Sequence, residues 1–187
     1  MSKAVVFFAD GTEECEALLV VDLLRRARVE VIVASAMGRR ELVSSHKIHL
    51  TADALAEEVD YSDVDMVVLP GGIPGTPNLA ANKTVTETCA AFAKAGRKVA
   101  AICAAPTLLA RAGLIGPGVR AVCYPGMEGE MTQKGVTALM DQPAVVDGHL
   151  VTGRGPGAAF DFALALLEVL AGADTARQVC AGLHYRR

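Results

Sequence analysis

The segment VAAICAAP, residues 99–106, passes from an apolar run directly into a run typical of a helix. Residues 98–102 predict a buried strand, and residues 104–112 predict a helix that Gly113 ends. Cys103 then lies at the turn between them, facing the N-terminus of the helix. Unpaired N–H groups there favour an anion, so we expect a lowered pKa and a reactive thiolate. The alternative is a buried thiol that only fills space at a strand end.

Predicted strands and helices alternate on both sides of this turn. The other predicted elements are strands at residues 3–8, 30–34, 65–69 and 119–124, helices at residues 13–28, 85–95 and 158–171, a last short helix near Asp174, an edge hairpin within residues 37–51, and a second hairpin within residues 144–152. This alternation predicts an α/β fold with a mostly parallel central sheet and helices on both faces.

The composition indicates a densely packed globular chain. Hydrophobic residues make up 52% of the 187 residues and aromatic residues 4%, which is typical of parallel sheets covered by helices. No linker, low-complexity stretch or internal repeat divides the chain, so we predict one domain over residues 1–187. The net charge of −3 argues against a nucleic-acid partner. We see neither a signal peptide nor an apolar stretch long enough to cross a membrane, and we expect a cytoplasmic protein.

The cysteines and histidines do not form a metal motif. The five cysteines are scattered and contain no C-x-x-C pair, so neither a zinc ribbon nor a thioredoxin-type motif is present. Apart from Cys103, we interpret them as buried free thiols that act as small hydrophobic residues. His46 and His49 fall in the predicted edge hairpin, where alternate strand faces would separate the two rings. We therefore predict no metal site.

In doubly wound sheets the ligand crevice lies at the carboxyl ends of the strands. Residues 9–15, residues 70–78 and the turn at Cys103 all leave from such ends. Gly71 and Gly72 allow backbone N–H groups to approach a ligand closely, as an oxyanion site requires. The alternative for the glycine pair is simply a tight turn.

Three glutamates open the first predicted helix. For Glu13 and Glu14 the ordinary role, complementing the helix dipole, is sufficient. Glu16 differs because it lies near the apolar stripe that includes Val20, and so we expect it to point inward. A carboxyl group buried beside the Cys103 thiolate would have a raised pKa and could donate a hydrogen bond or a proton.

Four blocks of this sequence resemble the ThiJ/PfpI superfamily. They are FADGTEECE (residues 8–16), VLPGG (residues 68–72), AAICAAPT (residues 100–107) and TGRGPG (residues 152–157). The resemblance is closest to the branch of the Parkinsonism-associated protein (DJ-one) and bacterial YajL. It runs from residue 3 to about residue 183, with the blocks in the expected order.

This resemblance implies a flavodoxin-like three-layer sandwich and a homodimer. It also implies that Cys103 is a nucleophilic, oxidation-sensitive thiol and that Glu16 is its protonated partner. The resemblance further assigns an anion or oxyanion pocket to the backbone N–H groups of Gly71, Gly72 and Ala104. It implies no cofactor.

Other positions separate the chain from some relatives or extend the site. Where some relatives have a His-Pro pair near the cysteine, this chain has Tyr124-Pro125, and where PfpI-type proteases have a histidine after the nucleophile, it has Ala104. A Cys-His dyad is therefore not supported, and protease activity is not expected. Tyr124 is a candidate for the pocket lining. So are Arg154 and Pro156, which fall in a loop that in relatives packs at the dimer interface near the site.

The resemblance implies two functions that the sequence does not separate. The first is a cofactor-independent glyoxalase or deglycase in which Cys103 attacks a small 2-oxoaldehyde such as methylglyoxal, giving lactate. The second is a redox-sensing protein with a chaperone or stress-protective role, in which Cys103 is oxidised to a sulfinic acid beside Glu16. A hydrolase or isomerase acting on another substrate also remains open.

Overall fold

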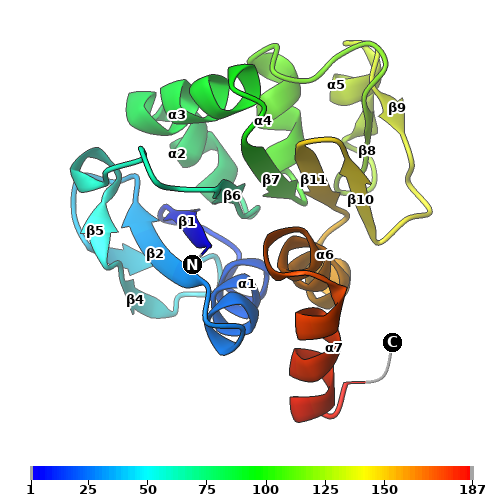
Figure 1. Ribbon diagram of the computed structural model, residues 1–187. Helices are drawn as coiled ribbons and strands as arrows, with labels where there is room; N and C mark the ends of the chain where they lie inside the picture. The colour runs from blue at the N-terminus through cyan, green and yellow to red at the C-terminus, as the bar shows by residue number, and fades with distance from the viewer. Residues whose placement is uncertain (1, 186–187) are drawn as a thin grey trace.

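The computed structural model describes residues 2–185 and is built around a central sheet (Figure 1). Its seven strands follow the order β10-β11-β7-β6-β1-β2-β5. Their bounds are β1 (Lys3–Phe8), β2 (Glu30–Ser35), β5 (Ala54–Leu55), β6 (Met66–Leu69), β7 (Lys98–Ile102), β10 (Ala144–Asp147) and β11 (Leu150–Gly153). All neighbouring strands are parallel except β10, which pairs antiparallel with β11. The predicted mostly parallel sheet is therefore confirmed.

Helices cover both faces of this sheet (Figure 1). On one face lie α1 (Glu14–Arg26), α6 (Ala159–Ala171) and α7 (Ala173–Gly182), and on the other lie α2 (Gly75–Ala81), α3 (Lys83–Lys94) and α4 (Ala105–Arg111). Strand β1 shows why both faces are needed. Ala4, Val6 and Phe8 enter one core, whereas Val5 and Phe7 enter the other, as the two-residue period of a strand dictates. The chain therefore forms the expected three-layer sandwich.

Several elements differ from the sequence-based expectation. Residues 70–78 were expected to be a loop, but they contain the start of α2. The predicted strand at residues 119–124 shrinks to β8 (Arg120–Ala121), which pairs with β9 (Thr137–Ala138) in a separate sheet. The backbone N–H of Val122 instead donates to the Thr152 hydroxyl at 3.0 Å, which removes that residue from a strand ladder.

Several small elements complete the fold. The hairpin predicted within residues 37–51 forms as β3 (Glu41–Val43) and β4 (His49–Thr51), but the pair makes a sheet of its own and is not an edge of the central one. A short helix, α5 (Glu128–Thr132), lies between β8 and β9. Two 3-10 turns occupy Ala56–Glu58 and Pro156–Ala158.

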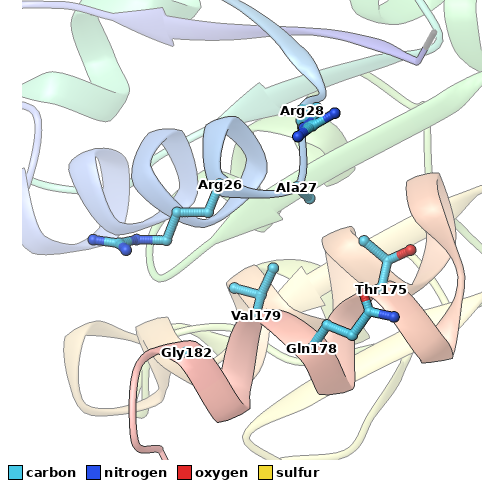
Figure 2. Close-up of a pocket in the computed structure, with 7 residues that line it drawn as sticks. All are labelled: Arg26, Ala27, Arg28, Thr175, Gln178, Val179 and Gly182. Atoms are coloured by element: carbon cyan, nitrogen blue, oxygen red, sulfur yellow. The ribbon is translucent and has the colours of Figure 1, made fainter.

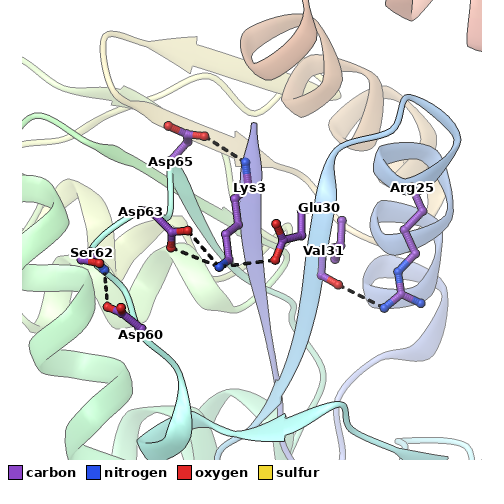
Figure 3. Close-up of polar contacts among 8 residues, drawn as sticks. All are labelled: Lys3, Arg25, Glu30, Val31, Asp60, Ser62, Asp63 and Asp65. Carbon is purple, nitrogen blue, oxygen red and sulfur yellow. Dashed lines mark hydrogen bonds and ion pairs between the residues drawn. The ribbon is translucent and has the colours of Figure 1, made fainter. Parts of the chain in front are cut away.

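The amino ends of three central strands are joined by polar contacts (Figure 3). The Lys3 backbone N–H donates to Asp65 Oδ2 at 2.9 Å, and Lys3 Nζ donates to Asp63 Oδ1 at 3.1 Å. The same ammonium lies 3.3 Å from Glu30 Oε1. These contacts occupy the edge of the sheet opposite the carboxyl ends, where the candidate site lies.

Among residues 2–185, no helix combines the length and the apolar character that crossing a membrane would require.

Candidate active site

Cys103 occupies a sharp elbow between β7 and α4. Its φ is 65°, in the left-handed region that side-chain-bearing residues rarely adopt, at a cost of about 1–2 kcal/mol. Its backbone N–H donates to the Gly153 carbonyl at 2.9 Å, and its carbonyl accepts from the Tyr124 N–H at 2.8 Å. Three chain segments thus hold the elbow in place. The side chain is largely buried, with 8% of the residue exposed.

Glu16 approaches Cys103 from the first turn of α1. The carboxylate of Glu13, the N-cap residue, fixes this turn by accepting from the Glu16 N–H at 2.7 Å. Glu16 is completely buried, as predicted from its place beside the apolar stripe. Its Oε2 accepts from the Gly71 N–H at 2.8 Å, and its carboxyl group hydrogen-bonds the Cys103 thiol. Its Oε1 is buried without a hydrogen-bond partner in the part of the chain that the structure describes.

Both side chains have pKa values above the ordinary values of their groups. Burial raises the pKa of Glu16 to about 7, although hydrogen bonds from Cys103 and Gly71 partly oppose the shift. Burial, and then the neighbouring Glu16 charge, raise the pKa of Cys103 to about 12, against the effect of the Gly72 and Ala104 backbone N–H groups. The prediction of a lowered thiol pKa is therefore wrong, because burial and the neighbouring Glu16 outweigh the backbone N–H groups at the start of α4. Near neutral pH the pair is a thiol beside a carboxyl group that exchanges its proton.

The glycines after β6 leave room for this pair. A Cβ on Gly71 would lie 2.5 Å from the Cys103 Cβ and 2.7 Å from Glu16 Oε2, so no larger residue fits. Gly72 has a φ of 96°, and its backbone N–H, like that of Ala104, hydrogen-bonds the Cys103 sulfur. The N–H of Gly71 is already donated to Glu16. The predicted three-donor anion pocket is thus reduced to two donors, from Gly72 and Ala104.

A cavity of about 370 Å³ opens above the Cys103 sulfur. Its walls are formed by Gly72, Ile73, Cys103, Ala104, Tyr124, Pro125, Gly126 and Met127. Tyr124 therefore lies in the wall, as anticipated. Sequence reasoning missed Ile73 and Met127, because nothing in the pattern showed how the loops after β6 and β8 fold back over the elbow.

Arg154 and Pro156 do not line this cavity. They border a neighbouring depression of about 170 Å³ that shares Tyr124 and Pro125 with it. The Arg154 guanidinium donates to the Asp141 carbonyl at 3.4 Å, away from the sulfur. Their proposed role at a dimer interface remains a prediction.

A larger depression, of about 490 Å³, lies between the end of α1 and α7 (Figure 2). Arg26 and Arg28 border it on one side, and Thr175 and Gln178 on the other. None of its lining residues is a cysteine, a histidine or an acid. It therefore lacks the nucleophile and proton acceptor that the Cys103 cavity has.

The remaining thiols lie outside the Cys103 cavity. Cys89 and Cys123 are buried, as predicted, and Cys180 is half-buried. Cys15 is exposed on the outer side of α1, so the interpretation of it as a buried thiol is wrong.

Ligand atoms of Glu13, Glu14 and His46 lie within 4.8 Å of one another. Both carboxylates already accept hydrogen bonds, from Glu16 and from His46. We assign no metal to this group.

Residues 2–169 match the DJ-1/PfpI family. The chain belongs to this family. Protein dj-1beta of Drosophila melanogaster is 37% identical over 184 residues, which cover 98% of this chain and 97% of that protein. Its crystal structure has a TM-score of 0.94 over the full length of both chains, at 36% identity. The expected membership of the DJ-1 branch is confirmed.

Two further members of the DJ-1/PfpI family bear on the chemistry. Glutathione-independent glyoxalase DJR-1.2 of Caenorhabditis elegans is 29% identical over 173 residues, covering 92% of this chain and 90% of that protein. Oxidized DJ-1 of Toxoplasma gondii has a TM-score of 0.93 at 32% identity, over all of both chains. Some relatives are longer: the chain spans 40% and 44% of the two DJ-1 homologs of Arabidopsis thaliana.

Proposed function

We propose that the protein is a cofactor-independent glyoxalase that converts small 2-oxoaldehydes into 2-hydroxy acids. One observation carries the proposal: the Cys103 thiol lies in the wall of a cavity and is hydrogen-bonded to the buried Glu16 carboxyl group behind it. A nucleophile beside a group that exchanges its proton near pH 7 suits addition to an aldehyde. The glyoxalase name of the Caenorhabditis elegans relative supports this choice of reaction.

The first step joins the sulfur to the aldehyde. The Cys103 sulfur attacks the aldehyde carbon, a C–S bond forms, and the thiol proton passes to the Glu16 carboxylate. The electrons of the C=O bond move to the oxygen. The N–H groups of Gly72 and Ala104, which hydrogen-bond the sulfur in the free protein, would then donate to this oxygen. Glu16 then returns the proton, and the product is a hemithioacetal.

The second step moves hydrogen between neighbouring carbons. Glu16, again a carboxylate, removes the proton from the carbon bonded to sulfur and delivers it to the oxygen of the adjacent ketone, so that an enediol forms. The hydroxyl on the sulfur-bearing carbon then loses its proton to Glu16, which passes it to the former ketone carbon, and the thioester of a 2-hydroxy acid results. No external oxidant or reductant is needed, because one carbon is oxidised and its neighbour reduced.

Hydrolysis completes the cycle. Water attacks the thioester, the C–S bond breaks, and the thiol of Cys103 is regenerated. The net reaction adds one water molecule to the 2-oxoaldehyde. With methylglyoxal the product is lactate.

The test is lactate formation from methylglyoxal without glutathione. Cys103→Ser should reduce turnover to the background rate, whereas Cys180→Ser, which changes a thiol outside the cavity, should retain it. Circular dichroism and the unfolding midpoint should confirm that both variants are folded. Equal loss in the two variants would reject the assignment of Cys103 as the nucleophile.

A redox role is the second candidate, because Glu16 Oε1 is buried and has no partner within residues 2–185. Two equivalents of peroxide would convert the thiol to a sulfinic acid and release two molecules of water, and the free carboxyl oxygen could pair with a sulfinate oxygen. The raised pKa of Cys103 argues for slow oxidation at rest. Mass spectrometry after peroxide treatment, in a variant series that includes Glu16→Ala, measures this directly.

Three further expectations stay proposals. Removal of early glycation adducts from proteins would be a by-product of the same thiol chemistry. A homodimer at micromolar concentration is expected from the family resemblance, and light scattering would detect it. A cytoplasmic location would be tested by fractionation.

A further inference from the structure

The walls of the Cys103 cavity carry almost no polar side-chain groups. Of the residues that line it, only Cys103 and Tyr124 have a polar side-chain atom, and none carries a charge. Ligand sites normally place a few polar groups at the reacting end of a ligand and apolar groups around the rest of it. Here the polar end is the thiol with the N–H groups of Gly72 and Ala104.

The rest of the wall must therefore face the substituent of the substrate. Ile73 is 64% exposed, so much of its apolar side chain is open to a ligand. Met127 is half-buried in the wall of the same cavity and can adjust its shape, because its side chain is unbranched. A methyl group would cover little of these two side chains in a cavity of about 370 Å³. An aryl or branched alkyl group would cover more.

The charges near the cavity oppose an anionic substituent. Glu16 lies beneath the sulfur. At the rim, Glu128 Oε2 accepts from the Gly126 N–H at 2.7 Å, which holds a second carboxylate next to the wall. The nearby cation, Arg154, borders the adjoining depression and donates to a backbone carbonyl. An anion would lose its water here without gaining a cationic partner.

We infer that the site selects uncharged 2-oxoaldehydes whose substituent is apolar and larger than methyl, and that Ile73 and Met127 set this preference. The inference rests on the proposed glyoxalase function, which it narrows to a substrate class.

The kinetic test compares three substrates: phenylglyoxal, methylglyoxal and 4-carboxyphenylglyoxal. We expect kcat/KM for phenylglyoxal to exceed that for each of the other two by about tenfold or more, which corresponds to about 1.4 kcal/mol. Ile73→Thr and Met127→Gln should each lower the ratio of phenylglyoxal to methylglyoxal by threefold or more. Val146→Thr is the matched control, since Val146 is also an exposed apolar residue, 45% accessible, but lies on β10. A ratio near one, or a preference for the carboxylated substrate, would overturn the inference.

A second measurement does not depend on turnover. Iodoacetanilide, iodoacetamide and iodoacetate each alkylate a thiolate, with sulfur displacing iodide, and differ only in an aryl, neutral or anionic group. Mass spectrometry gives the rates at Cys103 and at the half-buried Cys180 of the same molecules. We expect the preference for the aryl over the anionic reagent to be at least tenfold greater at Cys103.

The two measurements separate the possible failures. Absence of aldehyde turnover together with this alkylation preference would reject the glyoxalase and keep the apolar, uncharged site. Equal alkylation preferences at both cysteines would reject the site's selectivity, whatever the turnover.

Discussion

Glu14 and Glu16 lie in the same turn of α1, but their carboxyl groups have very different pKa values. Burial raises the pKa of Glu14, but donors from its own backbone, Ser44, Ser45 and His46 outweigh it and bring the pKa to about 2. Burial also raises the pKa of Glu16, and there it dominates and brings the pKa to about 7. The two residues are both buried and are only two positions apart.

The difference lies in which side of the helix each residue faces. Two positions along a helix turn the side chain to nearly the opposite side. Glu14 faces the β3–β4 hairpin, where Ser45 Oγ donates at 3.0 Å and His46 Nδ1 lies 2.7 Å from its carboxylate. Glu16 faces the sheet, where Gly71 and the thiol are its only hydrogen-bond donors among the described residues. Glu16 is the more deeply buried of the two and has fewer donors, and both differences place its pKa above that of Glu14.

The largest expected effect is on turnover. Glu16→Gln should lower kcat with 2-oxoaldehydes by about 100-fold or more, as loss of a general acid–base group does. Glu14→Gln should change kcat by less than threefold, because the Glu14 carboxylate hydrogen-bonds Ser45 and His46 and not the Cys103 thiol. Initial rates of the two folded variants test the contrast, and a comparable loss in both would show that the outer carboxyl group also serves the reaction.

The second effect is on the pH dependence of catalysis. Attack requires the Glu16 carboxylate as the proton acceptor, so kcat/KM should rise as pH increases through about 7, the pKa of Glu16. Glu14→Gln should leave this rise in place, because Glu14 is already ionised well below that range. Rates between pH 5 and 9 measure the profile. A rise that occurs only above pH 9 would indicate that direct ionisation of the thiol, and not Glu16, controls attack.

The third effect is on stability. The pKa of Glu16 is about 7 in the folded chain against 4.5 without its surroundings, so the folded state binds more protons between these values. The free energy of unfolding contributed by this group is therefore fully present below pH 4.5 and falls by about 3 kcal/mol as pH rises through 7. Denaturant unfolding at pH 5 and 8 should show this loss in the wild type and a smaller change in Glu16→Gln. The same pH change in both proteins would contradict the shift.

The smallest effect is on stability in acid and comes from Glu14. Its pKa is shifted in the opposite direction from that of Glu16. The lowered pKa of Glu14 means that its contribution is present above pH 4.5 and is lost as pH falls through about 2. His46→Ala removes one donor, but the His46 side chain is 71% exposed, so the free energy of unfolding at pH 4 should fall by at most about 1 kcal/mol. His49→Ala, in the same hairpin, is the control. Identical acid-unfolding curves for the two variants would show that His46 does not act on Glu14.

Much of the fold could be predicted because the central strands are continuous apolar runs with clear ends. The sequence did not predict α2, because Gly75 and Pro77 within it are poor helix formers. That helix is held by tertiary contact: a Cβ on Gly75 would lie 2.6 Å from the Gly11 carbonyl oxygen, which shows how closely the two backbones pack. Short elements of this kind depend on neighbours that are distant in the sequence.

The candidate site also has features that the local sequence predicts and features that depend on tertiary contacts. Cys103 and Glu16 could be identified because an elbow and an apolar stripe are local patterns. Other features depend on how separate loops pack together. These are the hydrogen bond from the Gly71 N–H to Glu16 and the parts of the cavity wall that Ile73 and Met127 form. The raised pKa of Cys103 also depends on that packing, since it comes from burial and from a carboxyl group 87 positions away.

The elbow at Cys103 has a consequence for protein engineering. The main-chain contacts with Gly153 and Tyr124 fix the backbone of residue 103, and neither involves its side chain. A different nucleophilic side chain at this position would therefore point in the same direction and would have the same neighbour, the Glu16 carboxyl group. Selenocysteine, whose selenol ionises more readily than a thiol, could therefore be installed without redesigning the scaffold. The backbone of residue 103 would then hold the selenium atom in the position that the sulfur occupies now.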